Sequence, residues 1–142
     1  RELIEKGNIF LNRSGTGNEV SKYHLEAIIA FWHTQTNLDQ KVKWENILQS
    51  YNRLLQIDYS PMAALNRTYA LSMARNKNEA LDEALKIDLK QNHLYHLLLA
   101  ELYKGQNTEK QQEHLQIAAA FAKTQNERKW ILEKLAGAKK IN

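Results

Sequence analysis

The sequence predicts an all-α fold in which about seven to eight helices pair into stacked antiparallel hairpins. Only one proline and five glycines occur in 142 residues, and long stretches consist of Leu, Ala, Glu, Lys and Gln, which lose little side-chain freedom in a helix. Apolar side chains recur at three- and four-residue steps, which is the period of a helix rather than a strand. The third observation is an internal repeat, which predicts that similar helical units follow one another.

The repeat is carried by a Leu-x-Ile element. It occurs in Leu55–Asp58, Leu85–Asp88 and Leu115–Ala118, at a spacing of thirty residues. Each unit divides into a first apolar helix, a short polar turn and a second helix that ends near this element. Helix, turn and helix in a unit of this length is the plan of tetratricopeptide repeats. The sequence therefore predicts one helical-repeat domain over residues 1–142, a right-handed tetratricopeptide-like stack.

The first half of the chain contains four predicted helices. A glycine-containing loop at residues 14–18 separates the first two helices, because glycine permits the backbone conformations that end a helix. Ser60 and Pro61 begin the fourth helix, since serine can cap free amides and proline at the first helical position loses no hydrogen bond. The predicted ranges are approximately 1–12, from the glycine loop to Gln35, 41–57 and 61–74.

The second half contains four further predicted helices. Gly105 closes the second of these, and Asn107 or Thr108 caps the third. Asn126 is expected to cap the last helix, on which Lys129, Glu133 and Lys134 suggest the solvent-facing end that an open stack needs. The predicted ranges are Glu79–Leu89, Leu94–Lys104, Thr108 to about Lys123, and from Asn126 onward.

Composition excludes several classes of protein. Cysteine is absent, which excludes disulfides, thiolate catalysis and thiolate zinc sites. No window holds eighteen consecutive apolar residues, and residues 1–12 do not resemble a signal peptide. We therefore expect a soluble, cytoplasmic protein with no membrane partner. The net charge of +4 comes from twenty basic residues scattered among sixteen acidic ones, which favours a solvated mixed-charge surface over direct nucleic-acid binding.

The titratable residues form no convincing catalytic or metal-binding pattern. His93 and His96 are three residues apart and could share a metal, but no acidic residue or third histidine lies at a matching helical step. His24, His33 and His114 stand isolated along the chain. No nucleophile is paired with a base. We expect neither an enzyme nor a metal, a cofactor or a small-molecule substrate.

Asn66 and Arg67 fit the apolar pattern of their helix least well. Asn66 shares a helical face with Met62, Tyr69 and Met73, so its amide is expected to be partly buried and to need hydrogen-bond partners. Two interpretations remain open. The pair forms a structural latch between neighbouring hairpins, or it lies in a binding groove.

The segment Ser60-Pro61-Met62-Ala63-Ala64-Leu65-Asn66-Arg67 carries the most specific similarity to a known family. It resembles the SPxxALNR segment in the C-terminal, tetratricopeptide-like domain of a subgroup of extracytoplasmic-function sigma factors. The similarity covers nearly the whole chain, through residues 23–33, 44–58, 95–98 and 126–135 in the same order. The chain departs from the family in the hairpin 77–90 and at Lys110, where alanine is expected.

The resemblance implies a role in transcription initiation. In such a protein two helical regions that bind DNA and RNA polymerase, sigma regions 2 and 4, precede this part and alone contact promoter DNA. The chain starts at Arg1 within helical sequence and without a methionine, so we expect a C-terminal fragment. The resemblance further implies a non-catalytic regulatory domain that contacts its own sigma regions, RNA polymerase or a separate regulator.

The candidate partner-binding residues lie where the first helices of successive units would line one continuous surface. The alternative function is a free-standing tetratricopeptide adaptor that binds a peptide or a partner protein in the same groove. A helix-turn-helix upstream of Arg1 would favour the sigma factor, whereas a signal peptide or more repeats would favour the adaptor. The candidate residues are Tyr23, Glu26, His33, Asn66, Arg67 and His96.

Overall fold

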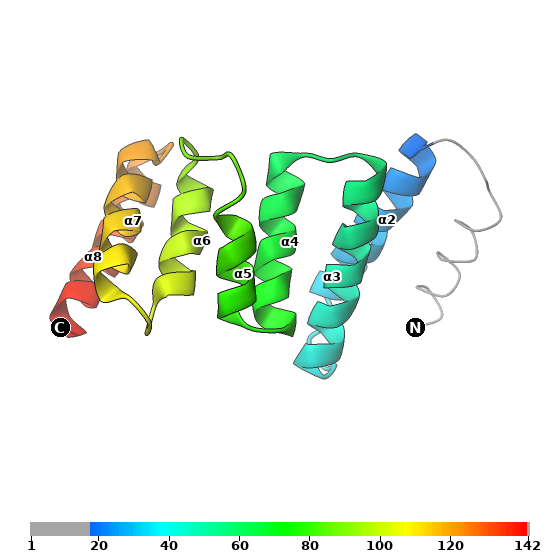
Figure 1. Ribbon diagram of the computed structural model, residues 1–142, viewed down its shortest axis with the longest axis horizontal. Coiled ribbons are helices and arrows are strands. Elements are labelled where there is room, and N and C mark those ends of the chain that lie inside the picture. The colour runs from blue at the N-terminus through cyan, green and yellow to red at the C-terminus, as the bar shows by residue number, and fades with distance from the viewer. Residues whose placement is uncertain (1–17, 142) are drawn as a thin grey trace. The chain divides into compact units, whose positions relative to one another are not determined.

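The computed structural model describes residues 18–141, which form seven α-helices and contain no strand (Figure 1). The helix predicted over residues 1–12 lies outside the described residues. The contacts group the chain into two compact units, one ending at Arg75 and one beginning at Asn76, and each unit is described by itself. None of the helices within residues 18–141 combines the length and the apolar character needed to cross a membrane.

The first unit contains three helices, α2 (Asn18–His33), α3 (Gln40–Ile57) and α4 (Pro61–Ala74). Helix α3 packs against both α2 and α4, and successive helices run antiparallel (Figure 1). Large side chains from all three helices form the core, because each helix buries one apolar face. The most deeply buried include Leu25 and Trp32 of α2, Ile47 and Leu48 of α3, and Leu65 and Leu71 of α4.

Helix α2 ends two residues before the predicted end at Gln35. The hydroxyl of Thr34 donates to the carbonyl of Phe31 at 2.7 Å. The amides of Thr34 and Gln35 close three-residue turns onto Phe31 and Trp32, each at 3.1 Å. These side-chain and backbone bonds satisfy the last carbonyls and stop the helix.

Helix α4 begins as predicted, with Ser60 as its N-cap and Pro61 in the first helical position. The Ser60 hydroxyl accepts a hydrogen bond from the amide of Ala63 at 3.1 Å. This bond satisfies one of the amides that the first turn of a helix leaves without a partner. The predicted range 61–74 is confirmed at both ends.

Ser60→Ala is expected to lower the free energy of unfolding by about 1 kcal/mol, because the amide of Ala63 loses its acceptor. Urea denaturation followed by circular dichroism measures this loss. Ser72→Ala is the matched control, since its hydroxyl donates to the carbonyl of Tyr69 within the same helix and alanine is the better helix former. Equal losses for both variants would contradict the capping role.

The second unit contains four helices, α5 (Lys77–Ala84), α6 (His93–Tyr103), α7 (Thr108–Phe121) and α8 (Gln125–Ile141). Each packs on the next along the pairs α5 with α6, α6 with α7 and α7 with α8. The end of α6 is followed by Gly105, as predicted, with a φ of 82° that favours glycine. Asn107 caps α7, accepting a hydrogen bond from the amide of Lys110 at 3.0 Å.

The prediction for α5 was wrong at both ends. Asn76 caps the helix by accepting from the amide of Glu79 at 2.8 Å, so the helix starts at Lys77 rather than Glu79. It stops at Ala84 because the amides of Lys86 and Ile87 bond three residues back instead of four, at 3.2 and 3.1 Å. This tighter turn buries Ile87 and leaves Leu85 exposed.

The predicted cap of α8 at Asn126 was also wrong. Thr124 accepts the hydrogen bond from the amide of Glu127 at 3.0 Å, and the Glu127 carboxylate accepts from the amide of Lys123 at 3.1 Å. This arrangement resembles a capping box, except that the carboxylate accepts from the amide of Lys123, one residue before the cap, rather than from the amide of Thr124. Lys129, Glu133 and Lys134 are exposed, as predicted.

Candidate functional site

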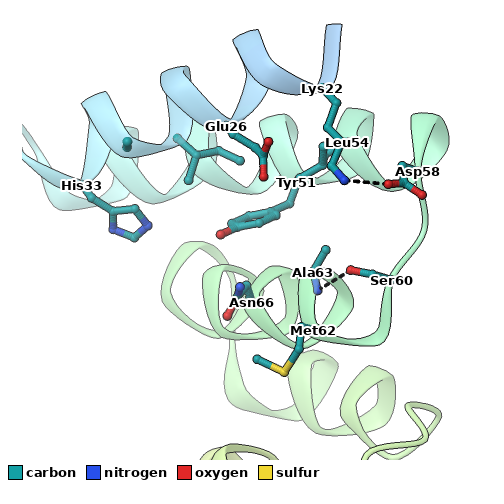
Figure 2. A pocket seen from close by; sticks show the side chains of 12 residues that line it. Lys22, Glu26, His33, Tyr51, Leu54, Asp58, Ser60, Met62, Ala63 and Asn66 are labelled. Atoms are coloured by element: carbon teal, nitrogen blue, oxygen red, sulfur yellow. Dashed lines mark hydrogen bonds and ion pairs between the residues drawn. The ribbon is translucent and has the colours of Figure 1, made fainter. Parts of the chain in front are cut away.

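A groove of about 410 Å³ opens between α2, α3 and α4, wholly within the first unit (Figure 2). This volume is within the range of roughly 300 to 1,000 Å³ that is typical of ligand sites. The lining residues of α2 lie three or four positions apart and so share one helical face. The groove is lined by Lys22, Glu26, Ile29, Ala30 and His33 of α2, by Tyr51, Leu54 and Asp58, and by Ser60, Met62, Ala63 and Asn66.

One end of the groove is closed by an ion pair. The ammonium of Lys22 lies 2.7 Å from a carboxylate oxygen of Asp58, the C-cap residue of α3. This hydrogen bond and the charge of Asp58 raise the pKa of Lys22. The hydroxyl of Ser60 next to it is engaged in capping α4. The ion pair therefore links α2 to the end of α3, while Ser60 fixes the start of α4 (Figure 2).

The middle of the groove holds a phenol, a carboxylate and an amide (Figure 2). Burial raises the pKa of Tyr51, the hydrogen bond of the Asn66 side chain opposes this shift, and the charge of Glu26 adds to it. Tyr51 thus keeps its proton at neutral pH. Among the residues that the structure describes, no basic nitrogen lies within 4 Å of the Glu26 carboxylate.

His33 forms the other end of the groove. Its ring meets the ring of Trp44 edge to face, with 5.6 Å between centroids, and its backbone carbonyl accepts from the ammonium of Lys43 at 3.4 Å. Partial burial, followed by the charge of Lys43, lowers the pKa of His33. The imidazole is therefore neutral at neutral pH and adds no positive charge to the groove.

The groove brings together three of the six predicted partner-binding residues, Glu26, His33 and Asn66. Tyr23 does not line it. Its side chain is exposed and contacts the ring of His24 edge to face. Arg67 does not line it either, because its guanidinium donates to the side-chain oxygen of Asn52 on α3.

The expectation that Asn66 is partly buried was wrong, because its side chain is exposed at the groove. The face of α4 that packs into the core carries its neighbours Leu65 and Thr68 instead. Both residues nevertheless contact α3, Arg67 by donating to Asn52 and Asn66 through a side-chain hydrogen bond with Tyr51. Each residue thus makes a contact between helices, and Asn66 also lines the groove.

His96 lies in the second unit and is 5% exposed. Its Nε2 lies 2.6 Å from the carbonyl oxygen of Lys90, and because a carbonyl only accepts, Nε2 carries the hydrogen. Its Nδ1 then accepts from the Nδ1–H of His114 at 3.0 Å. His114 is therefore not isolated, and both ring nitrogens of His96 have partners within this unit.

His93 and His96 do not share a site. The Nε2 of His93 lies 3.3 Å from the Glu127 carboxylate of α8, while His96 pairs with Lys90 and His114. Across the part of the chain that the structure describes, no group of three or more His, Asp or Glu side chains could hold a metal ion.

Sequence reasoning missed Lys22, Tyr51, Asp58 and Met62 as groove residues. The signal for Lys22 was available, because it precedes Glu26 by one helical turn on the same face. Tyr51 could not be found in this way, since it belongs to the apolar stripe of α3 and is only half buried. The hydroxyl of Tyr51 faces the groove because α2 and α4 pack on the two sides of α3.

Comparison of the chain with protein-family models, with curated proteins and with solved structures found no match.

Proposed function

We propose that the chain is a non-catalytic protein-interaction domain, and that it acts as the C-terminal regulatory domain of a sigma factor of the extracytoplasmic-function type. In this role it controls transcription initiation by contacting the sigma regions of its own protein, RNA polymerase or a separate regulator. Promoter DNA is contacted only by the sigma regions that would precede it. We also propose that its paired helices belong to a right-handed tetratricopeptide-like stack.

The groove between α2, α3 and α4 is the observation that carries the interaction role. It combines apolar walls, such as Ile29 and Leu54, with polar groups that project from three helices. Binding sites commonly have this composition, because apolar area supplies affinity and a few polar groups fix orientation. Ser60 is engaged in capping α4, and Lys22 and Asp58 form an ion pair. The other polar groups can form hydrogen bonds with a ligand. This arrangement suits binding rather than catalysis.

The sigma-factor role rests on the resemblance of residues 60–67. Several residues of this segment have a structural explanation, since Ser60 and Pro61 start α4 and Ala64 and Leu65 lie in the core. Arg67 joins α4 to α3. Asn66 alone presents its amide at the groove. Residues 60–67 thus stabilise α4 and also contribute the amide of Asn66 to the groove.

A free-standing adaptor that binds a peptide or partner protein is the second candidate. The adaptor function is favoured by one observation: all residues that line the groove lie between Lys22 and Asn66. A groove complete within one unit needs no other region of a larger protein in order to bind.

Filling the groove in the full-length protein tests the proposal. Ala30 lines the groove and is exposed, so Ala30→Trp is expected to fill it without disturbing the core. Ala27→Trp on the same helix is the matched control, because Ala27 is also exposed and does not line the groove. The measurement is promoter-specific transcription with purified RNA polymerase, alongside a variant that lacks residues 18–142.

We expect the deletion to change transcription several-fold, Ala30→Trp to reproduce that change, and Ala27→Trp to leave it near the wild-type level. Unchanged transcription after the deletion would contradict the sigma-factor role. If the deletion changes transcription but Ala30→Trp leaves it at the wild-type level, the regulatory contact lies outside the groove.

A further inference from the structure

We infer that the groove binds an extended protein segment that carries a lysine or arginine, and that Glu26 is the residue that pairs with this cation. The inference rests on the proposed function, because it takes the groove between α2, α3 and α4 as the binding site. It adds the chemical class of the bound segment and the residue that selects it.

The charges of the groove leave one carboxylate unbalanced. The ammonium of Lys22 lies 2.7 Å from the carboxylate of Asp58, and the charge of Glu26 acts on the same ammonium more weakly, so one cation faces two carboxylates. His33 is neutral, since burial and the charge of Lys43 lower its pKa. The remaining charged side chain in the lining is Glu26, which has no basic nitrogen within 4 Å among the described residues. A cation is therefore the complementary ligand.

The surroundings of Glu26 suit a long basic side chain. The carboxylate lies beside the ring of Tyr51 (Figure 2), and the walls include the apolar side chains of Ile29 and Leu54. Lysine and arginine bury their hydrocarbon stems along apolar surface while the charged head stays partly in water. An aromatic ring near the head adds a cation–π attraction.

Asn66 and Tyr51 suit the backbone of the same segment. One N–H of the Asn66 amide donates to the hydroxyl of Tyr51, and its second N–H and its oxygen match the carbonyl and the N–H of a peptide group. Tyr51 retains its proton because its pKa is raised, so its hydroxyl can also donate. These two groups come from α3 and α4, opposite the face of α2 that carries Glu26 (Figure 2).

The length of the groove fits an extended segment. Lys22 and His33 lie at its two ends on α2, and the helical rise places them roughly 16 Å apart. About five residues of extended chain cover this distance. An acidic segment fits less well, because Asp58 already holds the ammonium of Lys22 and Glu26 would repel a second carboxylate.

A peptide library tests the inference on the full chain. The probe is a displayed library of random linear seven-residue peptides, selected on the wild-type protein, and each enriched peptide is resynthesised with a fluorescent label. Fluorescence anisotropy then gives Kd for the wild type and for Glu26→Gln, Glu26→Lys and Ala30→Trp. Glu133→Gln is the matched control, because Glu133 is exposed on α8 and does not line the groove.

We expect enriched peptides to share a lysine or arginine at one position. Glu26→Gln should weaken their binding about three- to five-fold, as for a partly exposed ion pair, and Glu133→Gln should not. Exchange of the basic residue of the peptide for glutamine should weaken binding to the wild type but not further weaken binding to Glu26→Gln. Selection on Glu26→Lys should enrich acidic residues at that position.

Two other outcomes overturn the inference in distinguishable ways. Peptides that lose binding with Ala30→Trp but show no basic preference and no coupling to Glu26 would overturn the charge selection and leave the groove as a binding site. Failure to enrich any peptide whose binding Ala30→Trp abolishes would overturn both the inference and the binding role of the groove.

Discussion

Ile131→Ala is expected to lower the free energy of unfolding by about 2 to 5 kcal/mol, the usual cost of truncating a buried isoleucine. Ile131 is 0% exposed and belongs to a cluster with Ala100 of α6, Leu115 and Ala118 of α7, and Leu135. The alanines around it carry short side chains that cannot fill the space left behind. The truncation therefore loses both transfer free energy and packing contacts.

Urea denaturation followed by circular dichroism measures this effect, with Leu132→Ala as the control. Leu132 is the next residue of α8 but is 47% exposed, so its truncation should change the free energy of unfolding by no more than about 0.5 kcal/mol. Similar losses for the two variants would contradict the orientation of α8. A large difference would show that one face of this helix is part of the core of the second unit.

Acidification below about pH 6.5 is expected to destabilise the second unit through His114. Burial, followed by the charge of His96, lowers the pKa of His114 in the folded state; the charge of Glu113 opposes this shift and that of Lys110 adds to it. The unfolded chain keeps the ordinary value near 6.5. Above that pH both states are neutral at His114 and its full contribution to stability is present. Below it the unfolded state binds a proton that the folded state resists, so stability falls.

The contacts of His114 explain why the folded state resists this proton. Its Nδ1–H donates to His96, whose ring stacks on it with 5.2 Å between centroids. Tyr103 stacks on His114 at 5.7 Å, and Phe121 stacks on His96 at 6.3 Å. The pair is thus enclosed by rings from α6 and α7, which provide little solvation for a charge.

The free energy of unfolding, measured in urea between pH 7.5 and 5, checks this prediction. A difference of one bound proton contributes at most about 1.4 kcal/mol per pH unit. His114→Phe removes the titrating group and should flatten the pH dependence, with a remainder from His33, whose pKa is also lowered. Tyr103→Phe keeps the stacked ring and should retain the wild-type slope. An unchanged slope for His114→Phe would contradict the assignment.

Local sequence signals predicted most of the helices, because caps and breakers act over a few residues. Ser60 with Pro61 and Gly105 marked their boundaries correctly. The errors arose where two local signals competed. Thr124 and Asn126 are both good caps, and Thr124 caps because Glu127 can then reach back to the amide of Lys123. Near Leu85 the repeat predicted more helix than the turn at residues 86–87 allows.

The groove was predicted only in part, because its residues lie up to 44 positions apart, from Lys22 to Asn66. Periodicity identified the correct face of α2 through Glu26 and His33. It did not predict that the exposed amide of Asn66 lies near the hydroxyl of Tyr51, since neither residue is near the other in sequence. His96 shows the opposite error, because a polar residue expected at a binding surface is 5% exposed.

By itself the sequence determined the helical class, the order of the helices and several caps, since these depend on side-chain entropy, periodicity and hydrogen bonds within one turn. Tertiary structure alone decided which polar side chains are satisfied internally and which remain available. Arg67 and His96 found partners on neighbouring helices, whereas the carboxylate of Glu26 has no basic nitrogen within 4 Å among residues 18–141. The physical reason is that burial and ion pairing depend on distances between helices, which no local pattern encodes.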